Sequence, residues 1–88
     1  MHYKATITIT LRPSILDPQG KATLQGLREL GYKEVQQLRI GKFIEMQLEA
    51  ASEEEARQVV QDACERLLAN PVMEDYRFEL EPLTWAAS

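Results

Sequence analysis

Residues 35–50, VQQLRIGKFIEMQLEA, lie in the middle of this 88-residue chain and set the number of strands that its sheet can have. Its apolar side chains fall on even-numbered positions, which is the period of a β-strand with one buried face. They are Leu38, Ile40, Ile44, Met46, Leu48 and Ala50, with Lys42 as the exception. Two arrangements keep this parity, and they predict either four strands or three.

In the first arrangement the stretch is a hairpin, with Gly41, Lys42 and Phe43 as a three-residue loop. In the second it is one long strand bent at Gly41, because a glycine inside a strand often marks a bulge. Such a strand would span roughly 50 Å, against about 30 Å for a compact domain of this size, so it would need a second subunit to cover it. Gly-Lys-Phe is a poor turn sequence, which favours the bent strand, but the pattern leaves both open.

Residues 3–11 show the same alternation and predict a half-buried strand rich in β-branched residues. Its apolar face consists of Tyr3, Ala5, Ile7, Ile9 and Leu11. Between the two stretches, Asp17 stands where a helix N-cap belongs, and Pro18 suits the first helical position. Gly31 suits the position after the last turn. A helix is therefore expected here, with a modest apolar stripe of Ala22, Leu24, Leu27 and Leu30.

The C-terminal half predicts a second helix and a last strand. Ser52 and Glu55 have the spacing of a capping box, and apolar residues then recur at intervals of three and four. These residues are Ala56, Val59, Val60, Ala63, Leu67 and Leu68. Asn70-Pro71 ends the helix. The strand that follows ends at Pro82, and it turns toward the core the side chains of Tyr76, Phe78 and Leu80.

These elements predict an α+β fold with two helices packed on one face of a small antiparallel sheet, related to the ferredoxin-like arrangement. The sheet has three long strands, or four if residues 35–50 form a hairpin. A single domain over residues 1–88 is expected. A chain this short buries only about 60–65% of its unfolded surface, so association with another subunit is expected as well.

Composition excludes several classes of function. The net charge of −4 argues against a nucleic-acid binder, and no apolar run is long enough for a membrane span. The lone Cys64 and the absence of a charged-then-apolar leader predict a cytoplasmic protein. His2, Cys64 and scattered carboxylates form no nucleophile–base pair, metal-ligand spacing or phosphate loop. We therefore expect no catalytic, cofactor-binding or metal-binding residue in this chain.

Two short segments and one aromatic residue are candidates for a partner interface. The first segment contains the candidates Asp17, Gln19 and Gly20. Helix capping accounts for Asp17 and Pro18 but leaves Gly20 unexplained, and a glycine in a first turn usually permits close approach of a ligand or another backbone. A further candidate is Trp85, because a tryptophan in a short tail either packs back or docks on a partner.

The second segment contains the candidates Arg39, Gly41 and Lys42. The two cations would hold an anionic group together, or Arg39 simply points outward and Lys42 is solvated at the bend. Lys42 interrupts an apolar face, which predicts a local opening or a charged neighbour.

Three segments of the chain resemble the PurS family in order and spacing: residues 15–20 (ILDPQG), 35–45 and 67–76 (LLANPVMEDY). The family's Asp-Pro-Gln-Gly corresponds to residues 17–20, and its Arg-Ile-Gly-Lys to residues 39–42. The resemblance covers nearly the full length. The tail at residues 85–88 follows no pattern typical of the family.

The resemblance implies a subunit of phosphoribosylformylglycinamidine synthase, which acts in purine biosynthesis. PurS-type subunits are not enzymes by themselves; as homodimers, with tetramers possible, they bridge a glutaminase subunit and a large ATP-dependent synthetase subunit and support ammonia transfer. The complex uses ATP and Mg²⁺, and this subunit would bind neither. The alternative is a free-standing regulatory domain with a ferredoxin-like fold that senses a small ligand.

Overall fold

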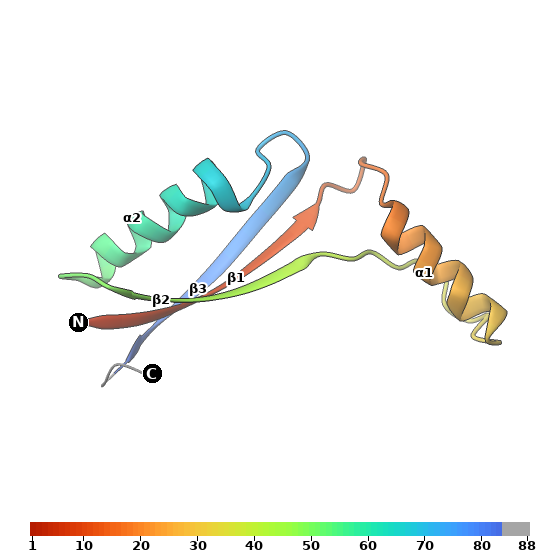
Figure 1. Ribbon diagram of the computed structural model, residues 1–88, viewed down its shortest axis with the longest axis horizontal. Helices are drawn as coiled ribbons and strands as arrows, with labels where there is room; N and C mark the ends of the chain where they lie inside the picture. The colour runs from red at the N-terminus through yellow and green to blue at the C-terminus, as the bar shows by residue number, and fades with distance from the viewer. Residues whose placement is uncertain (84–88) are drawn as a thin grey trace.

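Three strands and two helices make up the part of the chain that the computed structural model describes, residues 1–83. The elements are β1 (His2–Leu11), α1 (Pro18–Glu29), β2 (Lys42–Glu49), α2 (Glu53–Ala63), a π-helical turn η1 (Cys64–Leu68) and β3 (Glu74–Leu83). The strands form one antiparallel sheet in the order β2-β1-β3 (Figure 1). The predicted α+β class and three-stranded sheet are confirmed. Trp85 lies outside the described residues.

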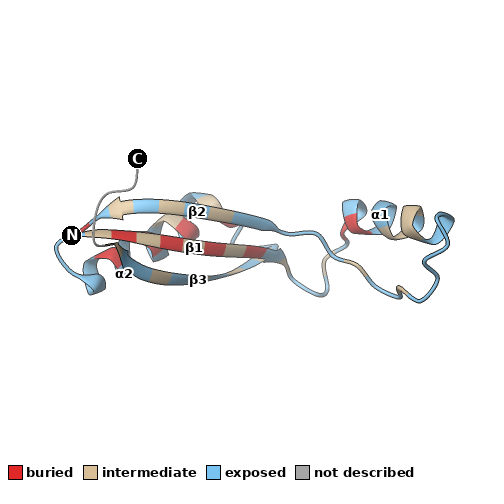
Figure 2. Ribbon diagram, turned by 90° about the horizontal axis from the view of Figure 1, so that it is seen from below, coloured by how far each residue is buried: buried red, intermediate tan, exposed pale blue. Residues whose placement is uncertain are grey.

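The core lies between β1 and α2, as the alternation of residues 3–11 predicts. Ile7 of this central strand is paired on one side with Ile44 and on the other with Phe78. Figure 2 shows the buried residues following β1 and the covering face of α2. These residues include Tyr3, Ala5, Ile7, Ile9, Ala56, Val60 and Cys64. Tyr76, Phe78 and Leu80 pack against this core from β3, as predicted.

The prediction that both helices cover the sheet is wrong in one respect, because α1 lies beyond its end (Figures 1 and 2). We call residues 13–41 the arm. Within α1 only Gly20 is buried, and Leu30 is 76% exposed. The extended segments on either side of α1 carry the helix past the sheet, and its weak apolar stripe has no sheet surface to pack on. The radius of gyration is accordingly 16.9 Å, against about 12 Å for a compact chain of this length.

Residues 35–50 form no hairpin, so that alternative is wrong. Pairing with β1 begins at Lys42, opposite Ile9, and the chain before it runs on toward α1 without reversing direction (Figure 1). A Cβ atom on Gly41 would lie 2.5 Å from the carbonyl oxygen of Ile9. The glycine is therefore required by the close approach of β1, and the paired part of the predicted long strand is only Lys42–Glu49.

The helix boundaries follow the predicted signals, but two residues of the apolar stripe predicted for the second helix are exposed. Ser52 caps α2, and the last turn widens into η1, where the Ala69 N–H donates to the Cys64 carbonyl oxygen at 2.9 Å. The wider turn changes the angular spacing of the side chains, so Leu67 is 83% exposed although the helical period predicts it in the core. Val59, predicted in the same stripe, is also exposed. No helix within residues 1–83 has the length and apolarity to cross a membrane.

Candidate functional site

The two candidate segments, residues 17–20 and 39–42, contact each other where the arm leaves the sheet. The Asp17 side chain is the link, and the residue is only 7% exposed. Its Oδ1 accepts a hydrogen bond from the Gly20 N–H at 2.9 Å, and its Oδ2 accepts one from the Ile40 N–H at 2.8 Å. The Ile40 and Gly20 hydrogen bonds, in that order, hold the pKa of Asp17 below its ordinary value, because they favour the charged carboxylate. Asp17 thus caps α1 and also joins it to the segment that returns to β2.

Gly20 is explained by the same junction. A Cβ atom there would lie 2.7 Å from the Leu38 carbonyl oxygen and 2.6 Å from Asp17 Oδ2. The close approach predicted for Gly20 is therefore made by the chain's own backbone. Gln19, beside it, is exposed.

Arg39 and Lys42 have separate partners, so the structure does not bring the two cations together on one anion. The Arg39 guanidinium donates to the carbonyl oxygens of Arg12, at 3.0 Å, and Ile15, at 2.8 Å. Lys42 Nζ lies 3.7 Å from Glu74 Oε2, so Glu74 is the charged neighbour that the break in the apolar face predicted.

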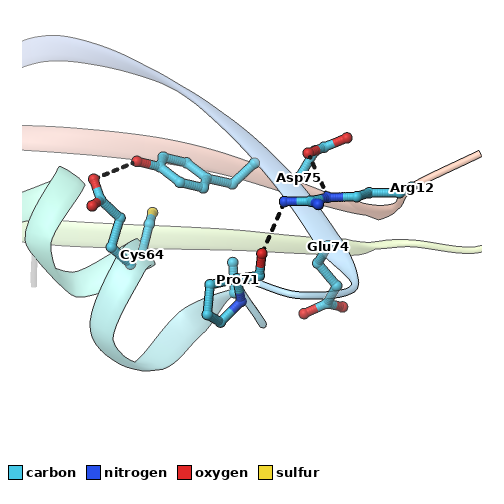
Figure 3. A pocket seen from close by; sticks show the side chains of 8 residues that line it. Arg12, Cys64, Pro71, Glu74 and Asp75 are labelled. Carbon is cyan, nitrogen blue, oxygen red and sulfur yellow. Dashed lines mark hydrogen bonds and ion pairs between the residues drawn. The ribbon is translucent and has the colours of Figure 1, made fainter.

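Arg12 connects this junction to the third family-like segment, a role that the sequence pattern did not predict. Its Nη2 donates to the Pro71 carbonyl oxygen at 2.8 Å, and its Nε lies 3.3 Å from Asp75 Oδ1 (Figure 3). Its backbone N–H donates to the Met73 carbonyl oxygen at 2.9 Å, and its own carbonyl accepts from Arg39. No sequence signal marks Arg12, because it continues the alternating polar positions of the first strand after Thr8 and Thr10.

The loop that Arg12 contacts is held by its own side chains. Asn70 Oδ1 accepts from the N–H groups of Val72, at 2.9 Å, and Met73, at 3.2 Å. Glu74 Oε1 accepts from the Asn70 N–H at 2.8 Å. Residues 70–75 therefore present Arg12 with a fixed set of oxygens, which is what an anchoring side chain needs.

An open pocket of about 420 Å³ lies between η1 and β3, with Arg12 on its wall (Figure 3). Tyr76 Oη donates to Glu65 Oε2 at 2.9 Å across it, and burial raises the pKa of the Cys64 thiol. A thiol whose pKa is raised is a poor nucleophile, so Cys64 packs as a small apolar side chain. In residues 1–83 no group of three His, Cys, Asp or Glu side chains is placed to hold a metal ion.

The exposed apolar side chains of the arm are its other prominent feature. They are Leu16, Leu30, Tyr32 and Ile40. An extended segment that carries several exposed large apolar side chains offers a surface that another chain can cover. The arm is therefore the candidate interaction surface, and the junction at Asp17, Arg39 and Arg12 supports it.

Comparison with known proteins gives one family throughout. The family model PurS, described as phosphoribosylformylglycinamidine (FGAM) synthase, matches residues 4–82. The phosphoribosylformylglycinamidine synthase subunit PurS of Synechocystis sp. is 50% identical over 86 residues, which cover 98% of this chain and 86% of that protein. The corresponding Bacillus subtilis subunit is 46% identical over 79 residues, covering 90% of this chain and 93% of that one.

Solved structures indicate the same family. A B. subtilis PurS crystal structure has a TM-score of 0.83 and 45% identity, covering 91% of this chain and 99% of that one. A chain in a structure described as PurLQS from Thermotoga maritima has a TM-score of 0.84 and 37% identity, covering 92% and 99% respectively.

Proposed function

This chain belongs to the PurS family of phosphoribosylformylglycinamidine synthase subunits, and on that premise we propose that it is the non-catalytic subunit that bridges the glutaminase and the ATP-dependent synthetase of the complex. The similar T. maritima chain comes from a structure described as PurLQS, which supports a role inside an assembly. The observation that carries the proposal is the arm, which extends past the sheet with exposed apolar side chains. A subunit that bridges two partners requires such a surface. By holding the glutaminase beside the synthetase, it would support the passage of ammonia from one to the other.

The polar side chains that join the three family-like segments to one another support a structural role. Asp17, Arg39 and Arg12 each contact backbone groups of the same chain, and Lys42 pairs with Glu74. Side chains used in this way hold a shape and are not arranged around a substrate. The proposed subunit holds no cofactor, and ATP and Mg²⁺ bind elsewhere in the complex. We place the assembly in the cytoplasm, where purine precursors are made.

A homodimer is part of the proposal. Leu30 is 76% exposed and Tyr32 is 53% exposed, and both lie at the far end of the arm. A second copy of the chain would cover these side chains and the half-buried edges of the sheet core. Burying that surface would add the core that an 88-residue chain lacks.

The test is reconstitution from purified components. The chain is mixed with the glutaminase and synthetase subunits, glutamine and ADP, and the mixture is separated by size-exclusion chromatography with light scattering. One ternary peak is expected. Failure of the wild-type chain to elute with both partners would overturn the proposed function.

A matched pair of variants sharpens the reconstitution. Lys42→Ala is expected to weaken the ternary complex about tenfold, because it releases Glu74 and changes the exposed charge where the arm joins β2. Lys33→Ala, at an exposed arm position, is the charge-matched control and should leave the affinity unchanged. Equal behaviour of the two variants would remove Lys42 from the interface.

The alternative is a free-standing domain that senses a small ligand. The pocket of about 420 Å³ beside β3 is the observation in its favour, since that volume suits a small molecule. A pull-down from cell extract separates the two functions, because a sensor domain would recover neither the glutaminase nor the synthetase.

A further inference from the structure

The direction of the arm needs a physical cause. α1 does not pack on the sheet, and two extended segments connect it to β1 and β2 (Figure 1). Segments of this kind are the usual places where a chain pivots, since no apolar contact opposes rotation of φ and ψ. Something other than core packing must hold the arm.

One restraint joins the two sides of the arm. Asp17 lies before α1, and Ile40 lies on the segment that returns to β2, yet the carboxylate of one accepts the N–H of the other at 2.8 Å. The distance from the Gly20 position to the Leu38 carbonyl oxygen shows that the two sides also touch through backbone. Hydrogen bonds to a charged acceptor are shorter and stronger than neutral ones.

A second restraint joins the arm to the sheet. Arg39 donates to the carbonyl oxygens of Ile15, on the arm, and Arg12, which directly follows β1. Arg12 in turn donates to Pro71 and pairs with Asp75 at the start of β3. The contacts therefore run without a break from the first turn of α1, across the end of the central strand, to the far edge of the sheet.

We propose that Asp17, Arg39 and Arg12 are positioning residues that lock the arm in a fixed direction relative to the sheet. The lock presents the arm to its partners in one orientation, so that assembly does not have to restrain a pivoting segment first. This consequence for assembly rests on the proposed function. The lock itself is a property of the single chain.

Asp17→Asn separates the lock from helix capping. Asparagine caps a helix as well as aspartate does, and its carbonyl oxygen still accepts from Gly20. Its amide NH₂ cannot accept from Ile40. Hydrogen exchange of the full-length chain, followed by NMR, should show the Ile40 amide exchanging at least about tenfold faster, with Gly20 and α2 unchanged.

Arg39→Ala should also speed the hydrogen exchange of the Ile40 amide. Arg39→Lys is the milder variant if the alanine variant does not fold. Both hydrogen bonds come from the Nη2 atom of Arg39, which the planar guanidinium holds in place. Lysine ends in a strongly hydrated ammonium on a flexible stem, so it should restore little protection. Arg28→Ala is the matched control, because Arg28 donates to the Val35 carbonyl oxygen at 3.1 Å within the arm. Unchanged protection of Ile40 in both the Asp17 and the Arg39 variants would overturn the lock.

Reconstitution then tests the consequence for assembly. Asp17→Asn and Arg39→Ala are expected to weaken the ternary complex about tenfold at a temperature where circular dichroism shows both variants still fully folded. A loosened arm with normal assembly would overturn the positioning role and leave the proposed function standing. A wild-type chain that fails to assemble would overturn the proposed function, while the exchange result would still decide the lock.

Discussion

At the scale of single residues, space rather than chemistry explains the two glycines of the family-like segments. Gly20 and Gly41 both lie where a Cβ atom would meet a backbone carbonyl oxygen, that of Leu38 in one case and of Ile9 in the other. Neither has a positive φ, so backbone strain is not the reason. From the sequence, Gly20 indicated a close approach but not what approached it. The approaching group is more than fifteen positions away, and no local pattern encodes it.

Gly41→Ala is expected to destabilise the chain by about 1–3 kcal/mol, because a carbonyl oxygen 2.5 Å away belongs to the central strand and cannot move freely. Gly26→Ala is the control. It lies inside α1 with no atom within 4 Å of the added Cβ, and alanine should stabilise the helix by about 1 kcal/mol. Urea unfolding measures both. A Gly41→Ala variant as stable as the wild type would contradict the packing at this site.

Asp17 should make stability depend on pH in a defined direction. Hydrogen bonds from Ile40 and Gly20 lower its pKa in the folded chain. A carboxyl whose pKa is lowered by folding contributes stability above its unfolded-state pKa, and that contribution is lost as pH falls through the folded-state pKa. The difference in unfolding free energy between the wild type and Asp17→Asn should therefore be constant near neutral pH and shrink in acid. A difference that grows in acid would contradict the hydrogen-bond arrangement.

At the scale of elements, local capping signals placed both helix starts correctly. Asp17 and Ser52 are the N-caps, as their sequence contexts predict, and Gly31 follows α1 with φ of 101°. The capping box of α2 differs in one detail, because Glu55 Oε2 accepts from the Ala51 N–H at 3.3 Å. The end of α2 was less predictable. A π-turn has no sequence signature comparable to a cap, so the exposed position of Leu67 could not be foreseen.

Ser52→Ala is expected to lower the free energy of unfolding by about 1 kcal/mol, because Ser52 Oγ accepts the Glu55 N–H at 3.1 Å. Ser14→Ala, at an exposed serine in the turn before α1, is the control and should change it by less than about 0.5 kcal/mol. Thermal unfolding of the two variants side by side provides the measurement. Equal losses would show that the serine cap contributes nothing specific to α2.

At the scale of the whole molecule, the shape itself indicates an incomplete unit. The chain extends over 51 × 28 × 17 Å, and the arm occupies the part that has almost no buried residues. The sequence predicted an overlong middle strand and a small core, which together indicated a partner. It also predicted α1 on the sheet, because two helices on one face is the economical arrangement for a domain that folds alone.

We predict that the chain sediments as a dimer at micromolar concentration. Leu30→Glu on the arm should shift it toward monomer, because a buried carboxylate without a partner opposes association. Leu67→Glu, on η1 and similarly exposed, is the matched control and should leave the dimer intact. A wild-type chain that sediments as a monomer would contradict the expected dimer, and species larger than dimers would indicate tetramers.

The starts of the two helices, the buried face of each strand and the family can all be read from the amino-acid sequence. Caps and periodicity act between residues a few positions apart, so they can be read along the chain. Two features appear only in the folded chain: α1 leaves the sheet, and three separate segments meet around Arg12. The contacts responsible join residues 23 positions apart, from Asp17 to Ile40, and 59 positions apart, from Arg12 to Pro71. Contacts across such separations exist only once the sheet has brought the ends of its strands together.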